Sequence, residues 1–304
     1  MSTTEGTTKY IVDTTILIRR DVLAILAIDN GPWKATSIRL KERNIVKELL
    51  HSKIYGAENG GTPLVVLHGL FGMADNWGSF GRSFGEKRQI HLLDLRNHGR
   101  SFHSDGMSVE EMVEDLGAYI ASIGAEKVLL LGHSLGGKVA MQFAIEHPEQ
   151  VEKLIIADIA PKAYPPHHED IFNALCAVDI NSMDNRKDVQ TKLESYLDDP
   201  GVIQFLLKNV FIKEDRKLGW RFNLDVLQRK YADFITIGVK AGIYAGPTLF
   251  LAGEKSRYIL PEDKIKIKEQ FPDVSFETIP NAGHWVQAEN PQAFDAFVAA
   301  FLDQ

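Results

Sequence analysis

Cysteine is almost absent from this sequence of 304 residues, in which Cys176 stands alone. No intrachain disulfide can therefore form, and nothing in the cysteine content indicates an oxidising compartment, which favours a cytoplasmic location. Cys176 lies in the apolar run Ala174-Leu175-Cys176-Ala177-Val178, so we expect a buried and chemically inert thiol.

Long apolar runs and an excess of basic residues are missing as well. No stretch approaches the ~18 apolar residues that span a bilayer, so stable membrane insertion is not expected. The formal net charge of −7 leaves no basic surface to displace phosphate counterions, which argues against nucleic acid as a partner. The adjacent His167 and His168 lack the spacing of metal ligands, and we expect them to be solvated. No metal and no cofactor is predicted.

What is present is the composition of an ordinary globular protein, with 44% hydrophobic and 25% charged residues. The first 45 residues stand apart. Arg19-Arg20 followed by the apolar residues 22–28 is weakly similar to a signal peptide, but residues 29–33 offer no small-residue cleavage site. We interpret residues 1–45 as an N-terminal tail of unassigned role, or as sequence upstream of the true start.

From Leu50 onward, short apolar runs alternate with amphipathic stretches, which is typical of a mostly parallel sheet covered by helices. The core of this α/β fold is predicted over residues 46–160 and 247–304. The expected buried strands are residues 64–67, 90–93, 128–131, 154–157, 248–251 and 275–279. The expected helices are residues 108–123, residues 138–147, which Pro148 ends, and residues 292–302.

Residues 161–246 interrupt this alternation with prolines, aromatic residues and further helical patterns. These patterns cover residues 171–178, 189–197, 202–207 and 224–231. The excursion is too long for an ordinary connection between two strands, and such insertions usually serve a function. We therefore predict a helical lid over residues 161–246.

The strongest chemical signal is Gly132-His133-Ser134-Leu135-Gly136, a G-x-S-x-G pattern between a predicted strand and a predicted helix. The pattern alone is common, but the strand–turn–helix context is that of a nucleophile elbow. Such a turn strains the serine, and glycines let the crossing segments approach closely. The helix N-terminus adds N–H groups and partial positive charge beside the hydroxyl. Ser134 is thus predicted to be a nucleophile.

A serine nucleophile needs backbone donors for the oxyanion that forms when it attacks a carbonyl. One donor is expected from the N–H of Leu135, the residue after the nucleophile. The second is expected from the glycine-rich loop after an earlier strand, residues 68–72. Leu70 is our candidate for this donor, with Phe71 as the alternative.

The general base is predicted to be His284, on a loop between the last predicted strand and the final helix. Gly283 before it allows close approach of the backbone. The order along the chain, with Ser134 first and the histidine last, differs from the order in the serine proteases of other folds.

The acid that would orient His284 is predicted to be Asp158, at the carboxyl end of its strand, where ligands bind in such sheets. The loop after the strand that ends at residue 251 carries Ser256 where aspartate is more usual. We expect Ser256 to be an additional hydrogen-bond partner. Asp225 in the predicted lid and Glu254 stay as alternatives for the acid.

A second cluster of charged residues, Asp94 and Arg96, follows the strand at residues 90–93. No nucleophile pairs with them, so we interpret the segment as structural, with buried hydrogen bonds that tie loops together. Aromatic residues also recur near the predicted site. Those that would wall an acyl pocket are Phe71, Trp77, Phe205, Phe222 and Trp285.

These motifs resemble the α/β-hydrolase superfamily, and more narrowly the YbfF-type esterases with their eukaryotic relatives, the α/β-hydrolase domain-containing protein 11 group. The resemblance covers roughly residues 50–302. It is carried by residues 68–72, 94–99, 132–138, 158–161, 201–208, 221–223 and 283–285. It implies a mostly parallel, eight-stranded sheet flanked by helices, with a helical lid inserted after the sixth strand.

The resemblance further implies hydrolysis of acyl esters or acyl-CoA thioesters, with Asp158 as the acid and Ser256 assisting the histidine. Some relatives are similar in placing the acid at the position of Asp225. We expect a serine hydrolase that acts on a small-molecule ester or thioester through an acyl-enzyme. A carbon–carbon hydrolase, a perhydrolase and a non-catalytic binding protein are the alternatives. Ser134 excludes dehalogenases and epoxide hydrolases, which need a carboxylate nucleophile.

Overall fold

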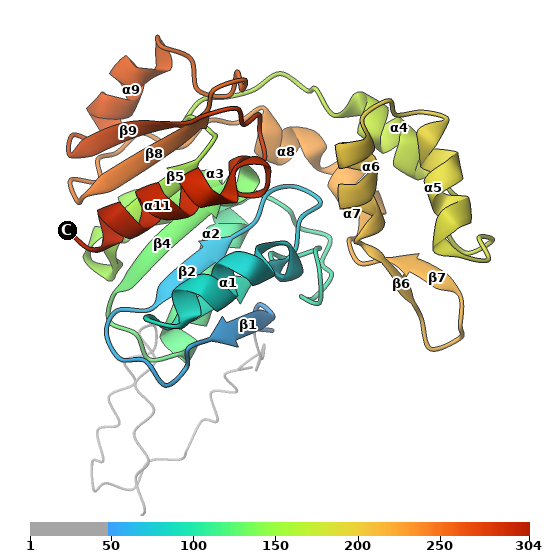
Figure 1. The fold of residues 1–304 in the computed structure, drawn as a ribbon, viewed down its shortest axis with the longest axis horizontal. Coiled ribbons are helices and arrows are strands. Elements are labelled where there is room, and N and C mark those ends of the chain that lie inside the picture. The colour runs from blue at the N-terminus through green and yellow to red at the C-terminus, as the bar shows by residue number, and fades with distance from the viewer. Residues whose placement is uncertain (1–47) are drawn as a thin grey trace, which may run out of the picture. The chain divides into compact units, whose positions relative to one another are not determined.

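Seven strands form one sheet in residues 48–304, the part of the chain that this computed structural model describes. Their order is β1-β3-β2-β4-β5-β8-β9 (Figure 1). β1 pairs antiparallel with β3, and the remaining neighbours are parallel. The strands are β1 (Ser52–Tyr55), β2 (Leu64–Leu67), β3 (Ile90–Leu93), β4 (Val128–His133), β5 (Val151–Ala157), β8 (Thr248–Gly253) and β9 (Val274–Ile279).

The six predicted buried strands are confirmed, with ends that differ by at most three residues. Within residues 48–304, the main sheet has seven strands where eight were expected, and the insertion follows its fifth strand along the chain, β5, instead of the sixth. β1 has no counterpart among the predicted strands. It lies at the edge of the sheet with partly exposed side chains, so it lacks the apolar run that reveals the others. The predicted tail, residues 1–45, lies outside the described residues.

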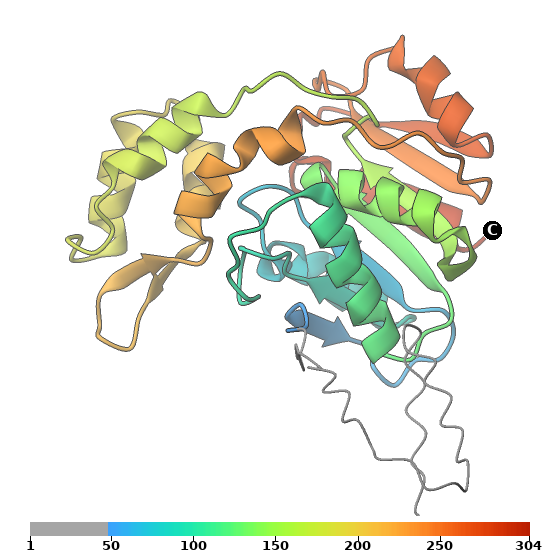
Figure 2. The ribbon, with the colours of Figure 1, turned by 180° about the vertical axis from the view of Figure 1, so that it is seen from behind.

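Helices cover both faces of the sheet, because successive strand residues point to opposite sides. In β2, Val65 belongs to the hydrophobic cluster under α2 and α3, whereas Val66 belongs to the cluster under α1 and α11. Figure 1 shows α1 and α11 in front of the sheet, and Figure 2 shows α2 and α3 on the other face. The covering helices are α1 (Gly78–Gly85), α2 (Val109–Ser122), α3 (Leu135–Glu146), α9 (Asp263–Gln270), α10 (Val286–Glu289) and α11 (Pro291–Leu302).

The three predicted core helices are confirmed, and their ends have local causes. At the start of α2, Ser108 Oγ accepts the Glu111 N–H at 3.2 Å, and Glu111 Oε2 accepts the Ser108 N–H at 2.9 Å, which is a capping box. α3 begins at Leu135, three residues before the predicted start, since the Lys138 N–H already donates to Ser134 O at 3.1 Å and the first turn includes Gly136 and Gly137. It ends just before Pro148, as predicted.

The insert, residues 161–246, holds helices where helices were predicted. It contains α4 (Glu169–Ala177), α5 (Arg186–Glu194), α6 (Pro200–Leu207), α7 (Leu224–Arg229) and α8 (Tyr231–Ile235). It also contains an antiparallel hairpin that was not predicted, β6 (Val210–Ile212) and β7 (Leu218–Trp220). Strands of three residues are too short to show a period of two.

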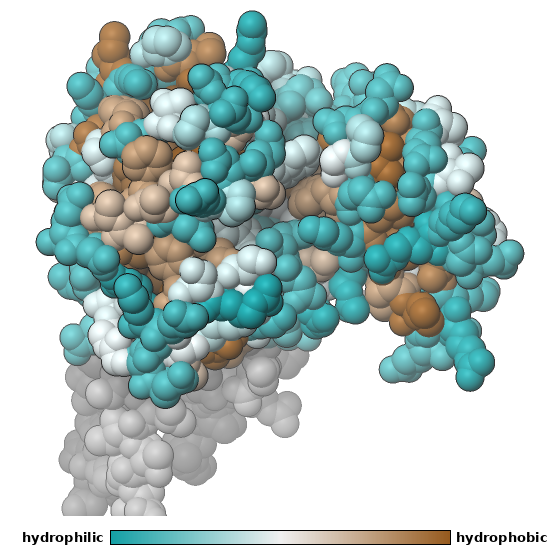
Figure 3. Space-filling view, in the orientation of Figure 1, coloured by the Kyte–Doolittle hydropathy of each residue, from teal (hydrophilic) through white to brown (hydrophobic). Residues whose placement is uncertain are grey.

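In the view of Figure 3, apolar side chains gather over α11 and on the insert.

Cys176 is exposed, so the prediction of a buried thiol is wrong. The apolar run around it forms α4, whose buried face carries Phe172, Ala174 and Leu175. Cys176 follows this buried pair on the other side of the helix, and its Sγ lies 3.3 Å from Gln228 Oε1. A run of apolar letters cannot show which side of a helix each residue occupies.

Two limbs of chain, residues 161–164 and 234–239, join the insert to the core, and together we call them the neck. The Tyr164 N–H donates to Ile235 O at 3.1 Å, and the Val239 N–H donates to Pro161 O at 3.3 Å. The limbs that leave and re-enter the core therefore lie side by side.

Lys138 of α3 connects the neck to the core by hydrogen bonds. Its Nζ donates to the carbonyl oxygens of Phe234, Ile235 and Ile237 at 3.1, 2.9 and 2.7 Å. The side chain is buried, and burial lowers the pKa of Lys138 to about 8. Carbonyl dipoles surround the ammonium group, and no carboxylate within residues 48–304 forms a salt bridge with it.

Within residues 48–304, no helix combines the length and the apolar character that a bilayer crossing requires.

Candidate active site

Ser134 stands at the sharp corner between β4 and α3. Its φ of +52° and ψ of −118° lie outside the regions that a residue with a side chain normally adopts. A Cβ on Gly132 would lie 2.3 Å from Gly136 O, and a Cβ on Gly136 would lie 2.6 Å from the carbonyl oxygens of Leu67 and His68. Only glycines permit the two segments to cross at this distance. The strand–turn–helix context predicted for the elbow is therefore present.

Ser134 and His284 line the same cavity, which is narrow and has a volume of about 40 Å³. The structure forms no hydrogen bond between these two side chains. Catalytic hydrogen bonds are often long in unliganded enzymes and tighten when substrate binds, so a shared cavity is the relevant geometry. The insert contributes His168, Ile171, Val202, Phe205 and Leu206 to the cavity wall.

His284 is held by a buried carboxylate. Its Nδ1 lies 2.8 Å from Asp158 Oδ2, and the Asp158 side chain has no exposed surface. Ser256 Oγ donates to the same oxygen at 2.5 Å, and the Gly253 N–H donates to Oδ1 at 3.0 Å. The two predicted partners of His284, Asp158 and Ser256, are thus hydrogen-bonded to each other beside the imidazole. With Nδ1 donating to the carboxylate, the lone pair of Nε2 is left to accept a proton.

Burial sets the protonation of this pair. It lowers the pKa of His284, so the imidazole is neutral near pH 7. Burial raises the pKa of Asp158, while the hydrogen bonds from Ser256 and from the Gly253 N–H act in the opposite direction by stabilising the carboxylate. A neutral base with a hydrogen-bonded acid behind it is what proton abstraction from a hydroxyl requires.

The other acid candidates lie elsewhere. The side chain of Asp225 is 74% exposed and forms a salt bridge with Arg229 at 3.0 Å. Glu254 Oε2 accepts the Asn281 N–H at 2.7 Å. Neither carboxylate hydrogen-bonds to His284, whereas Asp158 does.

The backbone N–H groups near Ser134 differ in whether they already donate a hydrogen bond within the protein. The Phe71 N–H donates to His98 Nε2 at 3.1 Å and is already used. Within the described residues the Leu70 N–H has no such partner, and Leu70 lines the cavity. Leu135 is the first residue of α3, where the N–H has no partner inside the helix. Of the two candidate amides in the loop after β2, that of Leu70 is therefore the one left free in the described residues.

Four of the five predicted aromatic residues line the cavity, namely Phe71, Trp77, Phe205 and Trp285. The rings of Phe205 and Trp285 lie 5.3 Å apart. The fifth, Phe222, is buried behind Phe71, with ring centroids 5.3 Å apart, and does not line the cavity.

Tyr258 and His133 are next to His284, although sequence reasoning singled out neither. The Tyr258 ring stacks on the imidazole at 3.8 Å and 16°. His133 Nε2 lies 2.8 Å from His284 O. The sequence indicated them only through their neighbours: Tyr258 lies two positions after Ser256, and His133 lies one position before Ser134.

The two adjacent histidines of the insert differ from each other. His167 is exposed, as expected, and its Nε2 lies 2.6 Å from Tyr258 Oη. His168 is partly buried, lines the cavity and has its Nδ1 2.5 Å from Tyr231 Oη, so the expectation of a solvated side chain is wrong for it. Burial lowers the pKa of His168 to about 3. Within residues 48–304, no group of three His, Cys, Asp or Glu side chains is placed to hold a metal ion.

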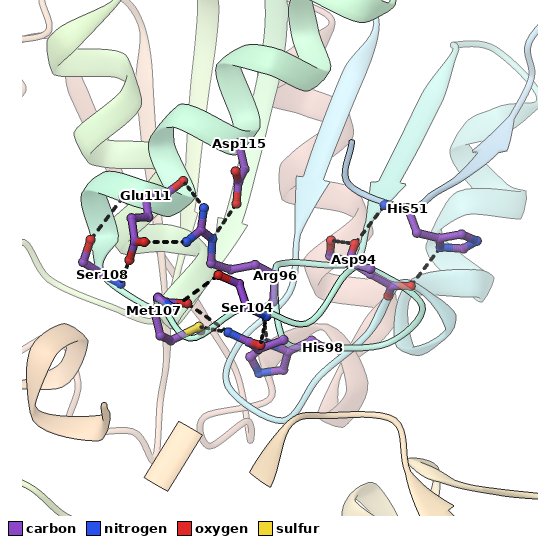
Figure 4. Close-up of polar contacts among 12 residues, drawn as sticks. His51, Asp94, Arg96, His98, Ser104, Met107, Ser108, Glu111 and Asp115 are labelled. Atoms are coloured by element: carbon purple, nitrogen blue, oxygen red, sulfur yellow. Dashed lines mark hydrogen bonds and ion pairs between the residues drawn. The ribbon is translucent and has the colours of Figure 1, made fainter. Parts of the chain in front are cut away.

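Asp94 and Arg96 make buried structural contacts. Asp94 Oδ2 lies 2.9 Å from His51 Nδ1, and Arg96 Nε donates to Asp115 Oδ2 at 2.6 Å (Figure 4). A second ion pair joins the Arg96 guanidinium to Glu111 at 2.9 Å. The structural interpretation of this segment agrees with these contacts.

The fold agrees with comparisons to known proteins. Residues 62–291 match the family model for the alpha/beta hydrolase fold. This match covers more than half of the chain, and the chain belongs to that family.

Within the family, the chain is similar to a group of esterases and lipases. It is 37% identical over 247 residues to the sn-1-specific diacylglycerol lipase ABHD11 of Mus musculus, covering 79% of this chain and 80% of the relative. It is 33% identical over 247 residues to the esterase YbfF of Escherichia coli, covering 81% and 95%. The solved structure of a marine microorganism esterase matches with a TM-score of 0.81 and 41% identity, covering 84% and 99%. The expected resemblance to these groups is confirmed.

The crossing at the elbow predicts a specific cost for Gly136→Ala. The added Cβ would lie 2.6 Å from two backbone carbonyl oxygens, which cannot rotate away. We expect the free energy of unfolding to fall by about 1–3 kcal/mol in urea titrations followed by circular dichroism. Gly117→Ala in α2 is the control, because its Cβ would meet only Phe143 Cε2 at 3.6 Å. Alanine favours a helix, so this variant should be neutral or gain up to ~1 kcal/mol. Equal losses in both variants would contradict the steric account.

Proposed function

We propose that this chain is a serine hydrolase that cleaves carboxylic esters or acyl thioesters through an acyl-enzyme. The observation that carries the proposal is the hydrogen bond from His284 Nδ1 to the buried Asp158, beside a cavity that His284 and the strained Ser134 both line. The names of the relatives, which are esterases and lipases, support ester substrates. A non-catalytic binding protein would have no need of this arrangement.

In the proposed reaction, Ser134 Oγ attacks the acyl carbonyl while His284 Nε2 takes its proton. Asp158 stabilises the imidazolium that forms, and Ser256 keeps the carboxylate in place by donating to the same oxygen. The N–H groups of Leu70 and Leu135 hold the oxyanion. His284 then protonates the leaving alkoxide or thiolate. Water resolves the acyl-enzyme by the same steps.

The insert is proposed to act as the lid of this site. Its residues Val202, Phe205 and Leu206 line the cavity, and Ile171 adds a further apolar side chain. Such a wall suits an uncharged acyl chain, because burying a charge there would cost much more than burying methylene groups. The substrate class we infer is therefore a small acyl ester or thioester with an apolar acyl group.

Ser134→Ala should lower kcat for p-nitrophenyl esters by at least about 10⁴-fold, since the acyl-enzyme can no longer form. A fluorophosphonate probe should label the unmodified protein and leave this variant unlabelled, as read by mass spectrometry. Cys176→Ala is the matched control, because it removes the exposed thiol and should change neither result. Normal esterase activity in Ser134→Ala would rule out the proposed nucleophile.

Asp158→Asn and Asp225→Asn separate the two acid candidates. Asparagine at 158 keeps the size of the side chain but removes the charge that stabilises the imidazolium, so kcat should fall by about 10³- to 10⁴-fold. Asp225→Asn alters an exposed salt bridge, and kcat should stay within about twofold. The measurement is kcat on one p-nitrophenyl ester with both variants folded. The reverse ranking would assign the acid to residue 225.

The pH dependence of kcat/KM follows from the burial of His284. The base acts only when neutral, so activity falls as the pH drops through its pKa. Burial lowers that pKa, which moves the acid limb below the ordinary imidazole value of about 6.5. Protonation of Asp158 at acid pH would add to the same loss. We expect a plateau through neutral pH in initial-rate measurements from pH 3.5 to 8. A midpoint above pH 7 would contradict the assignment.

A further inference from the structure

Two buried histidines connect the loop after β2 with the loop after β3. His68, in the first loop, accepts the Leu95 N–H at Nε2 with a distance of 3.0 Å. His98, in the second loop, accepts the Phe71 N–H at Nε2 with a distance of 3.1 Å. The two rings lie 5.1 Å apart and have almost no exposed surface. Each loop therefore supplies an imidazole that binds an amide of the other loop.

Both rings must be neutral for this exchange to work. His68 Nδ1 lies 2.7 Å from Gly69 O, and His98 Nδ1 lies 2.9 Å from Arg96 O. A carbonyl oxygen only accepts, so Nδ1 carries the proton in each ring and Nε2 offers a lone pair. Burial lowers the pKa of His68 to about 4 and that of His98 to about 3, in keeping with these contacts. A protonated ring would point an N–H at another N–H.

The bond to His98 acts on a strained peptide. Phe71 has a φ of +59°, which costs free energy for a residue with a side chain. Its N–H is held by His98, and its carbonyl oxygen accepts from Nδ2 of the buried Asn209 in the insert at 2.9 Å. The backbone of Phe71 is thus fixed on both sides, which also fixes the orientation of the residue before it, Leu70.

The peptide before Leu70 lies against the nucleophile. A Cβ on Gly69 would be 3.0 Å from Ser134 Cβ and 3.0 Å from His133 Nδ1. Any rotation of the loop would therefore change the position of the Leu70 N–H relative to the attacked carbonyl. Oxyanion donors act only within a narrow range of distances.

We propose that His98 is a positioning residue of the oxyanion loop. By accepting the Phe71 N–H, it removes that amide from competition and holds the Leu70 N–H toward the reacting carbonyl. The inference rests on the proposed function, because it assigns a role in the same site. It also gives the segment after β3 a part in the reaction beyond its structural contacts.

Hydrogen bonds hold the backbone of the segment that carries His98 in place. Asp94 Oδ1 accepts the Ala74 N–H at 2.6 Å, and its Oδ2 accepts the Arg100 N–H at 2.9 Å. Asn97, next to His98, donates from Nδ2 to Gly106 O at 3.0 Å. Figure 4 shows Arg96 pointing to α2 and His51 pointing to Asp94 on either side of the loop.

Two variants test the role of His98. His98→Leu removes the acceptor, whereas His98→Gln keeps an oxygen acceptor near the place of Nε2. In His98→Leu we expect kcat on p-nitrophenyl esters to fall by about 10²- to 10³-fold with little change in KM. Affinity for a trifluoromethyl ketone, which forms a charged tetrahedral adduct, should fall by a similar factor. His98→Gln should recover kcat to within about tenfold of the unmodified protein.

His91→Leu is the matched control for lost stability. His91 is also buried and also hydrogen-bonded, with Nδ1 2.7 Å from Tyr119 Oη, but it lies in β3 away from the cavity. At an equal loss of Tm, it should keep kcat within a few-fold. The proposal is overturned if His98→Leu keeps normal kcat, if its loss matches that of His91→Leu, or if the change falls on KM alone.

A readout independent of activity comes from ¹⁵N NMR of the ring nitrogens. The expected result is a neutral His98 with Nδ1 protonated and Nε2 bare from pH 5 to 8. A proton on Nε2 would overturn the proposal even if the enzyme is active. Failure of the proposed function is a different result, because Ser134→Ala would then keep its activity while the tautomer of His98 stayed as described.

Discussion

The close packing of β2, β4 and α3 at the elbow is the constraint on which the site depends. It places Ser134 in a conformation with positive φ, and this conformation persists because the surrounding backbone leaves room for nothing larger than hydrogen at residues 132 and 136. The same packing brings the loop after β2 against the serine. If Ser134 adopted an ordinary backbone conformation, its hydroxyl would move away from the backbone N–H groups of that loop.

The buried polar groups around this corner are arranged so that each imidazole has one donating and one accepting nitrogen. His68 and His98 use theirs to connect loops, and His284 uses its donor on Asp158. Protonating His68 or His98 would break the hydrogen bond that its Nε2 accepts, so the neutral form of these two rings is tied to the geometry of the loops. Desolvation is therefore not only a cost here, since it keeps the rings in the form that the contacts require.

The buried strands, the core helices and the identities of Ser134, His284 and Asp158 as neighbours were within reach of the sequence, because each follows from periodicity or from position at a strand end. The use of the Phe71 N–H in a hydrogen bond was not, since it depends on where the fold places His98. The predicted burial of Cys176 and the predicted exposure of His168 were wrong for a related reason. The side of a helix or loop on which a residue lies, and not its polarity alone, decides whether it is exposed. β1 and the β6–β7 hairpin carry too few buried residues to show a pattern.

The ammonium of Lys138 limits how the insert can move. Its charge is compensated by three peptide oxygens of residues 234–237, and separating them would leave a cation in the interior without acceptors. A hinge at that point is therefore costly. If the insert moves to open the cavity, as proposed, bending in the segments that bear α4 to α7 leaves these three contacts intact, and the base of the insert stays attached to α3.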